Sequence, residues 1–174
     1  MSIWDVKKDS EREEWLFVPH VSVGPLRFGM APDEVSASLR SNAPISRHVK
    51  RTSGNSELVE AQFTKLGVTA YYGKGEVLAC VAVDALVGPQ VRLDGTALVA
   101  RVPSEAEEWV CNHTDTHESD LIYTHAADPG SEDLGLILRA QRAGDIVLTR
   151  PLFLIREWAQ RSWDCIPASE WSTF

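Results

Sequence analysis

The segment CNHTDTHESDLIYTH, from Cys111 to His125, holds the densest group of side chains that could do chemistry. Imidazole and carboxylate groups together are typical ligands of zinc and iron, and His113 and His117 are spaced to share one face of a helix. The segment lacks the H-E-x-x-H order of zinc hydrolases, and its Asn, Thr and Asp residues favour turns. We therefore predict a solvent-exposed connection with no metal and no cofactor. Metal binding by His113, His117 and His125 is the alternative.

The three cysteines form no pattern typical of a disulfide framework, a metal site or a nucleophile. Cys80, Cys111 and Cys165 are odd in number, widely spaced and without a C-x-x-C pair. The chain also has no G-x-S-x-G segment, no phosphate-binding loop and no dinucleotide fingerprint. We predict reduced, packed thiols and no catalytic residues. The alternative is a small-molecule or metal-dependent enzyme that uses the region from Cys111 to His125.

Composition favours one folded domain that binds protein rather than nucleic acid. The 174 residues are 44% hydrophobic, which is enough for the core of a single domain spanning residues 1–174. The formal net charge of -8 repels nucleic acid and anionic membranes and suits a basic protein partner. The N-terminus lacks the apolar core of a secretory signal, and no stretch is apolar enough to span a membrane. We therefore expect a cytoplasmic protein.

The stretch VGPLRFGMAPDEV predicts a sharp turn followed by a helix. Pro32 suits the first helical turn, where its missing N–H is not needed, and Asp33 and Glu34 favour the positive end of the helix dipole. We expect the helix to run to about Arg40, and Gly29 to take a positive φ in the bend before it. One glycine pair without the spacing of a phosphate loop indicates a helix start and not an anion site.

Parts of this pattern recur, and the recurrence predicts an internal duplication. Val-Gly-Pro-Leu returns as Val-Gly-Pro-Gln, and a glycine and an acidic, proline-containing helix start follow it both times. Further along, LGVTAYYGKGEVLACVAVD matches LGLILRAQRAGDIVLTRPLF, so that Gly67 pairs with Gly135. We predict internal repeats over about residues 23–83 and 91–153, each with a strand, a helix and a hairpin.

Two such units predict an α+β fold. Their turn glycines lie between runs of β-branched and aliphatic residues, as antiparallel hairpins need. Neither half has enough apolar residues to cover both faces of a sheet. We therefore expect the halves to join edge to edge in one antiparallel sheet with helices packed on one face. A further amphipathic helix is predicted after Pro151, with Trp158 and Trp163 packed on the domain.

The opposite face of this sheet is the predicted binding surface. If Val68 and Leu136 face the helices, the alternation of a strand turns a second set of side chains to the other side. The set that we predict to bind a partner is Thr69, Tyr71, Ile137 and Arg139. Aromatic and arginine side chains of this kind are enriched at protein interfaces. The alternative is that another segment, such as residues 4–18, covers the face.

The segment LRFGMAPDEVSASL, residues 26–39, resembles the strand-turn-helix opening of the β-lactamase inhibitor protein and SmpA/OmlA-like families. In those families an apolar-x-x-Gly-Met segment leads into an acidic helix start. The β-lactamase inhibitor protein is itself a tandem repeat with helices packed on an antiparallel sheet. The resemblance therefore implies a scaffold that binds proteins with one sheet face. The chain also resembles small actinobacterial proteins with no assigned role, and it departs from the named families in having no secretion signal, lipobox, disulfide spacing or second Gly-Met.

These observations together predict a non-catalytic protein-binding module. An inhibitor or an immunity protein for a basic partner is the most specific form of that prediction. Nucleic acid and membrane are not expected as partners, because the chain is acidic.

Overall fold

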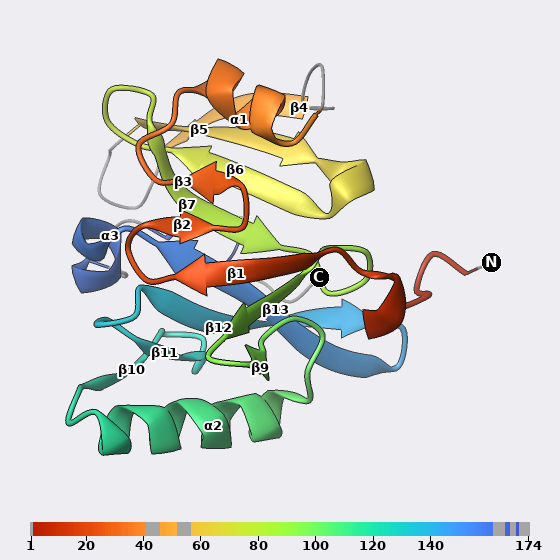
Figure 1. The fold of residues 1–174 in the computed structure, drawn as a ribbon, viewed down its shortest axis with the longest axis vertical. Helices are drawn as coiled ribbons and strands as arrows, with labels where there is room; N and C mark the ends of the chain where they lie inside the picture. Colours follow the sequence, from red (N-terminus) through yellow and green to blue (C-terminus); the bar gives the residue numbers. More distant parts are fainter. Residues whose placement is uncertain (1, 41–45, 52–56, 162–165, 168–169, 171–174) are drawn as a thin grey trace.

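The protein has an α+β fold, as the sequence predicts. The computed structural model describes residues 2–40, 46–51, 57–161, 166–167 and 170. Over these residues the strands form a five-stranded and an eight-stranded sheet, and the helices pack against them (Figure 1). Cys165, Trp163 and Trp171 lie outside the described residues.

The five-stranded sheet is built from strands at the start of each half of the chain. Its strands are β1 (Glu14–Val18), β2 (Ser22–Val23), β3 (Leu26–Arg27), β8 (Gln90–Leu93) and β9 (Thr96–Ala97). Their order is β3-β2-β1-β8-β9. β1 and β8 are parallel, with Trp15 beside Val91, and the other pairs are antiparallel. The long connection between β1 and β8 permits this parallel pairing.

The eight-stranded sheet is antiparallel throughout. One half of the chain supplies β4 (Ser46–Arg51), β5 (Glu57–Phe63), β6 (Val68–Tyr72) and β7 (Leu78–Val83). The other supplies β10 (Leu121–Tyr123), β11 (Pro129–Ser131), β12 (Leu136–Ala143) and β13 (Ile146–Leu154). The order is β10-β11-β12-β13-β7-β6-β5-β4, so β7 and β13 join two groups of four consecutive strands.

Three α-helices are found in the described residues: α1 (Pro32–Ser38), α2 (Pro103–Thr116) and α3 (Arg156–Gln160). Proline begins both α1 and α2, and the backbone N–H of Ala31 donates to the Glu34 carboxylate at the start of α1. Short 3₁₀ turns occur at η1 (Asp9–Glu11) and η2 (Thr64–Leu66). Among the described residues, no helix combines the length and the apolar character needed to cross a membrane.

The expectation of an exposed connection beginning at Cys111 is wrong, because α2 continues to Thr116. Val110 and Thr114 are buried one turn apart on the inner side of the helix. The Thr114 hydroxyl donates to the Val110 carbonyl at 3.0 Å, so its polar group is satisfied inside the helix. Burial of this face outweighs the turn preference of the neighbouring Asn, Thr and Asp residues.

The main core lies between the two sheets. Phe17 of β1 meets Phe153 of β13 with ring centroids 4.7 Å apart, and both side chains are buried. Val35 of α1 and Val110 of α2 belong to the same cluster. The small sheet, α1 and α2 therefore cover one face of the large sheet, as Figure 1 shows.

The other face of the large sheet has its own apolar cluster. Trp158 and Ala159 of α3 pack there with Tyr71, Ile137 and Leu152. The sequence-based expectation of a C-terminal helix packed on the domain is confirmed for this part of it. Because both faces of β7 are covered, all of its side chains are buried, and its sequence LACVAV is an uninterrupted apolar run.

Several of the residues that suggested a duplication occupy corresponding places. Gly67 and Gly135 both have a φ of 66°, and they immediately precede β6 and β12. By contrast, Val-Gly-Pro of residues 23–25 forms the turn from β2 to β3, whereas residues 87–89 come before β8. The internal repeat over residues 23–83 and 91–153 stays a prediction.

Gly29 has a φ of 92°, and the expectation of a positive φ there is confirmed. We expect Gly29→Ala to cost about 1 kcal/mol of unfolding free energy through backbone strain alone, because an added Cβ would have nothing within 4 Å. Gly67→Ala should cost roughly twice as much or more, because its Cβ would also overlap the backbone of Gly88. Urea denaturation of both variants measures the two losses. Equal losses would show that backbone strain alone determines both.

Candidate functional site

The face that we predicted to bind a partner is buried. The exposed fractions of Thr69, Tyr71, Ile137 and Arg139 are 9%, 1%, 0% and 3%. Of the two alternatives, an exposed face and a face covered by another segment, the structure therefore shows the second. The cover comes from α3 and from Ile166 and Glu170, which are both buried, and not from residues 4–18, whose strand β1 packs on the opposite side. The partner-binding role of these four residues stays a prediction without an accessible surface.

An ion pair lies under this cover. Arg150 donates from Nη2 to Glu170 Oε1 at 2.8 Å and from Nε to Glu170 Oε2 at 2.9 Å. The Tyr71 hydroxyl donates to the same carboxylate at 2.6 Å. A bidentate arginine with a further donor satisfies most of the hydrogen-bonding capacity of a buried carboxylate. Tyr71 therefore helps to hold Glu170 against the sheet.

The charges of this pair support each other. Burial by itself raises the pKa of Glu170, but the Arg150 guanidinium and its hydrogen bonds outweigh burial and hold the pKa below its usual value. Burial by itself lowers the pKa of Arg150, because it disfavours the charged guanidinium. The charge and hydrogen bonds of Glu170 outweigh burial, so the pKa of Arg150 is raised. Both groups are ionised at neutral pH.

Arg139 forms a second buried pair next to the first. Its Nε atom lies 2.8 Å from Asp128 Oδ2, but the N–H is not directed at a hydrogen-bond acceptor. Burial lowers the pKa of Arg139 and raises the pKa of Asp128, and in each case the partner's charge only partly compensates. Arg139 is a buried structural residue, not an exposed contact for a partner.

The histidine segment is divided between two elements. His113 and His117 lie on one face of α2 and its end, with ring centroids 4.0 Å apart, and His117 Nδ1 donates to the His113 carbonyl at 2.8 Å. Burial, followed by the nearby His117, lowers the pKa of His113. His125 follows β10. Among the described residues, no three His, Cys, Asp or Glu side chains are grouped to hold a metal ion.

Two groups that could act as nucleophiles are held in the protonated form. Complete burial raises the pKa of the Cys80 thiol. The Tyr123 hydroxyl donates to Glu107 at 2.8 Å, and this hydrogen bond raises the pKa of Tyr123 to about 12. A nucleophile is activated by a lowered pKa, and in both of these groups the pKa is raised instead.

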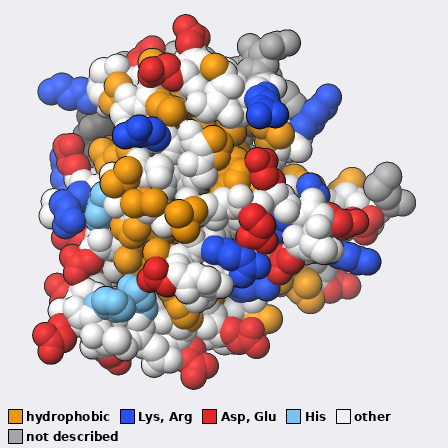
Figure 2. Space-filling model, viewed as in Figure 1, with side chains coloured by type: hydrophobic (Ala, Val, Ile, Leu, Met, Phe, Trp, Pro, Cys, Tyr) orange, Lys and Arg blue, Asp and Glu red, His pale blue; other side chains and the backbone are white. Residues whose placement is uncertain are grey.

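Exposed apolar side chains gather on the small sheet. The exposed fractions of Leu16, Val18 and Val21 are 63%, 38% and 48%. In β1 the burial alternates, so Trp15 and Phe17 point into the core while Leu16 and Val18 point outward. Figure 2 shows the orange side chains collected over the hairpin region of β1, β2 and β3. We call Leu16, Val18 and Val21 the outer face.

Charged side chains border the outer face. Arg92 of β8, the neighbour of Leu16, bonds Glu14 at 2.8 Å. Arg27 of β3 lies across the other side, opposite Ser22, which pairs with Val18. An apolar centre with a polar border is the usual anatomy of a protein interface. The alternation of EWLFV, residues 14–18, is the signal that could have located this face, but a five-residue alternation does not say which side is covered.

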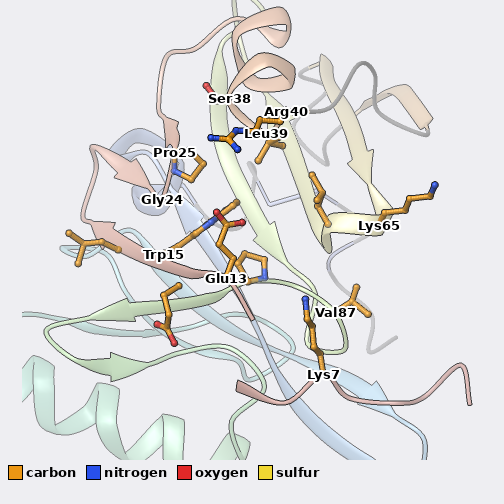
Figure 3. Close-up of a pocket in the computed structure, with 14 residues that line it drawn as sticks. Lys7, Glu13, Trp15, Gly24, Pro25, Ser38, Leu39, Arg40, Lys65 and Val87 are labelled. Atoms are coloured by element: carbon orange, nitrogen blue, oxygen red, sulfur yellow. The ribbon is translucent and has the colours of Figure 1, made fainter. Parts of the chain in front are cut away.

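A cavity of about 510 Å³ lies beside β1 (Figure 3). Trp15, the turn from β2 to β3, the end of α1, η2 and residues 87–89 line it. In Figure 3 Lys7 and Arg40 lie at opposite ends of this space, Trp15 and Glu13 lie between them, and Lys65 extends away. We call it the Trp15 pocket. No sequence pattern predicts this pocket, because its described lining residues come from six separate segments of the chain.

Comparisons with family models, with curated proteins and with solved structures find no match to this chain. The resemblance of residues 26–39 to the β-lactamase inhibitor protein and SmpA/OmlA-like families therefore stays a prediction.

The ion pair under α3 predicts a strongly non-additive pair of substitutions. Glu170→Leu or Arg150→Leu alone should each lower the unfolding free energy by about 3–5 kcal/mol, because each leaves one buried charge without its partner. The double variant should lose clearly less than the sum, since neither charge remains. Urea denaturation of the four proteins gives the coupling free energy. Losses that simply add would contradict the pairing.

The same carboxylate predicts a pH dependence. The pKa of Glu170 is lower in the folded than in the unfolded chain, so its stabilising contribution is complete above about pH 4.5 and is lost as the pH falls through the folded-state pKa. The difference in unfolding free energy between the wild type and Glu170→Gln should therefore shrink below pH 4.5. Urea titrations at pH 6 and pH 3.5 measure it. Glu108→Gln, at an exposed position of α2, is the control that should show no such change.

Proposed function

We propose that this chain is a non-catalytic protein-binding module that contacts its partner through the outer face. The observation that carries the proposal is the exposure of Leu16 and Val18 in the middle strand of the small sheet. These side chains stand on a strand that is paired on both edges, so the backbone holds them in place. Rigid apolar side chains in a charged border are the kind of surface that partners bury.

Charge supports a basic partner. The chain carries a net charge of -8, which accelerates association with a positively charged protein. A module of this kind can act as an inhibitor or as an immunity protein, because both cover a site on another protein and need no catalytic group of their own. The raised pKa values of Cys80 and Tyr123 agree with a non-catalytic role.

One exposed substitution tests the surface. Leu16→Asp should weaken binding of the partner at least about 30-fold, because a carboxylate would be placed at the centre of a buried apolar contact. The unfolding free energy should change by only about 0.5 kcal/mol, since Leu16 is exposed. Ile146→Asp, in the hairpin from β12 to β13 where Ile146 is 56% exposed, is the matched control. The partner is first isolated with the immobilised protein from a lysate of the source cells, and affinities are then measured by calorimetry with the purified partner.

Each result bears on the proposal directly. Loss of binding in Leu16→Asp with binding retained in Ile146→Asp supports the outer face as the interface. Equal affinity of both variants and the wild type would place the interface elsewhere. Failure of the wild type to retain any protein at micromolar concentration would count against the binding-module function itself.

A further inference from the structure

We propose that the partner of the outer face inserts one phenylalanine side chain, flanked by lysine or arginine, into a cleft between β9 and α2; this rests on the proposed function. Figure 1 shows β9 next to α2. The cleft has a volume of about 160 Å³ and is lined by residues 96–98, Arg101, Glu105, Ala106 and Trp109. We call it the α2 cleft.

The α2 cleft continues the outer face. Leu16 pairs with Arg92, and Arg92 pairs with Ala97, so these three side chains stand in one row on the same side of the small sheet. Neighbouring strands are about 4.8 Å apart, which places Ala97 about 10 Å from Leu16. A stable interface buries roughly 800 Å² of each partner and so reaches about 16 Å from its centre. An interface centred on Leu16 therefore reaches the cleft.

The size and lining of the cleft suit a single apolar side chain. Pockets for small molecules usually have volumes of about 300–1,000 Å³, so the α2 cleft is smaller than most of them. An apolar cavity of about 150 Å³ holds one benzene ring. Leu98 and Ala106 are buried at the base of the cleft, and the partly buried Trp109 forms one side. A phenylalanine ring packed on Trp109 would be the kind of aromatic contact that anchors protein interfaces.

The charges at the cleft favour basic residues beside the anchor. Arg101 Nη2 donates to both carboxylate oxygens of Asp9 at 2.8 Å, and Arg92 is paired with Glu14 at 2.8 Å. Both cations are therefore balanced by a carboxylate. Glu105 is exposed and forms no ion pair within the described part of the chain. One negative charge is thus left at the border of the cleft, where a lysine or arginine next to the phenylalanine can pair with it.

The cleft is held in shape by hydrogen bonds to the protein behind it. The Arg101 backbone N–H donates to Thr149 Oγ1 at 2.9 Å, and Arg101 Nε donates to the Val99 carbonyl at 2.9 Å. The Thr149 hydroxyl donates to the Leu98 carbonyl at 2.7 Å. A site that is already ordered costs less conformational entropy when it binds.

Tripeptides of defined sequence test the cleft without the partner. The chain has six tryptophans, and Trp109→Phe identifies the Trp109 resonance in the nitrogen–proton correlation spectrum of the labelled protein. Titration with N-acetyl-Lys-Phe-Lys-amide at pH 7 should shift this resonance in a saturable manner. The resonance of Trp158, on the other face of the large sheet, should not move. N-acetyl-Lys-Ala-Lys-amide should bind at least about tenfold more weakly, because it lacks the ring. N-acetyl-Glu-Phe-Glu-amide should bind at least about fivefold more weakly, because its charges are reversed.

A matched pair of charge reversals tests the role of Glu105. Glu105→Lys should weaken binding of the Lys-Phe-Lys peptide about fivefold, because it replaces an attraction with a repulsion. Glu157→Lys, at an exposed position of α3 on the other side of the molecule, changes the net charge equally and should bind within about twofold of the wild type. Leu16→Asp should also bind this peptide within about twofold. With the isolated partner, Glu105→Lys should weaken binding about fivefold.

The outcomes separate the cleft from the proposed function. A saturable Trp109 shift that depends on the phenylalanine and on Glu105 supports the cleft. No saturable shift, equal affinity for the alanine peptide, or equal effects of Glu105→Lys and Glu157→Lys would overturn it. A dimer of the wild type that Glu105→Lys dissociates, seen by light scattering, would assign the cleft to a second copy of the chain and also overturn it. If only Leu16→Asp weakens partner binding, the outer face stands and the cleft is refuted.

Discussion

The pairing of β7 with β13 is the constraint on which the rest of the structure depends. It joins the two groups of four strands through the partners Leu152 with Ala82, Phe153 with Val81, and Leu154 with Cys80. Each group alone would expose an unpaired edge and both faces of a small sheet. Because the alternation of each strand sends neighbouring side chains to opposite faces, the seam contributes to both apolar clusters at once. Both faces of the large sheet must therefore be covered.

The two faces of the large sheet are covered by different kinds of contact. On one side the small sheet, α1 and α2 form an apolar contact centred on Phe17 and Phe153. On the other side α3 and Glu170 cover a face that carries charged side chains, and the cover holds because Arg150 and Tyr71 satisfy the Glu170 carboxylate. Aromatic and arginine side chains, which are enriched at protein interfaces, are thus found inside the protein. The tyrosine and arginine that suggested a partner-binding surface contact the chain itself.

The outer face and the Trp15 pocket both involve residues of β1. Trp15 points into the core and lines the pocket, and Leu16, the next residue, points outward and also borders the pocket. The strand lies in the middle of the small sheet, paired with β2 and β8. Its backbone is therefore held on both edges, which gives both surfaces a rigid base.

Several local features of the fold could be predicted from short stretches of the sequence. Pro32 and the acidic residues after it predicted α1, and Gly29 predicted the positive φ before it, because each depends on only a few neighbouring residues. The α+β class followed from turn glycines between apolar runs. The alternation of Thr69 and Tyr71 with Val68 was also correct, since the period of a strand is a local property.

Tertiary structure alone decided which surfaces remain open. Thr69, Tyr71, Ile137 and Arg139 are buried because α3 and Glu170, distant in sequence, lie over them. The helix through Cys111 exists because Val110 and Thr114 find a buried face, although its local residues favour a turn. Which side of β1 is covered, and hence the exposure of Leu16 and the burial of Trp15, also depends on segments that are distant in sequence. Burial is a sum over contacts between distant segments, so the sequence determined the alternation of side chains, and only packing decided which of them reach solvent.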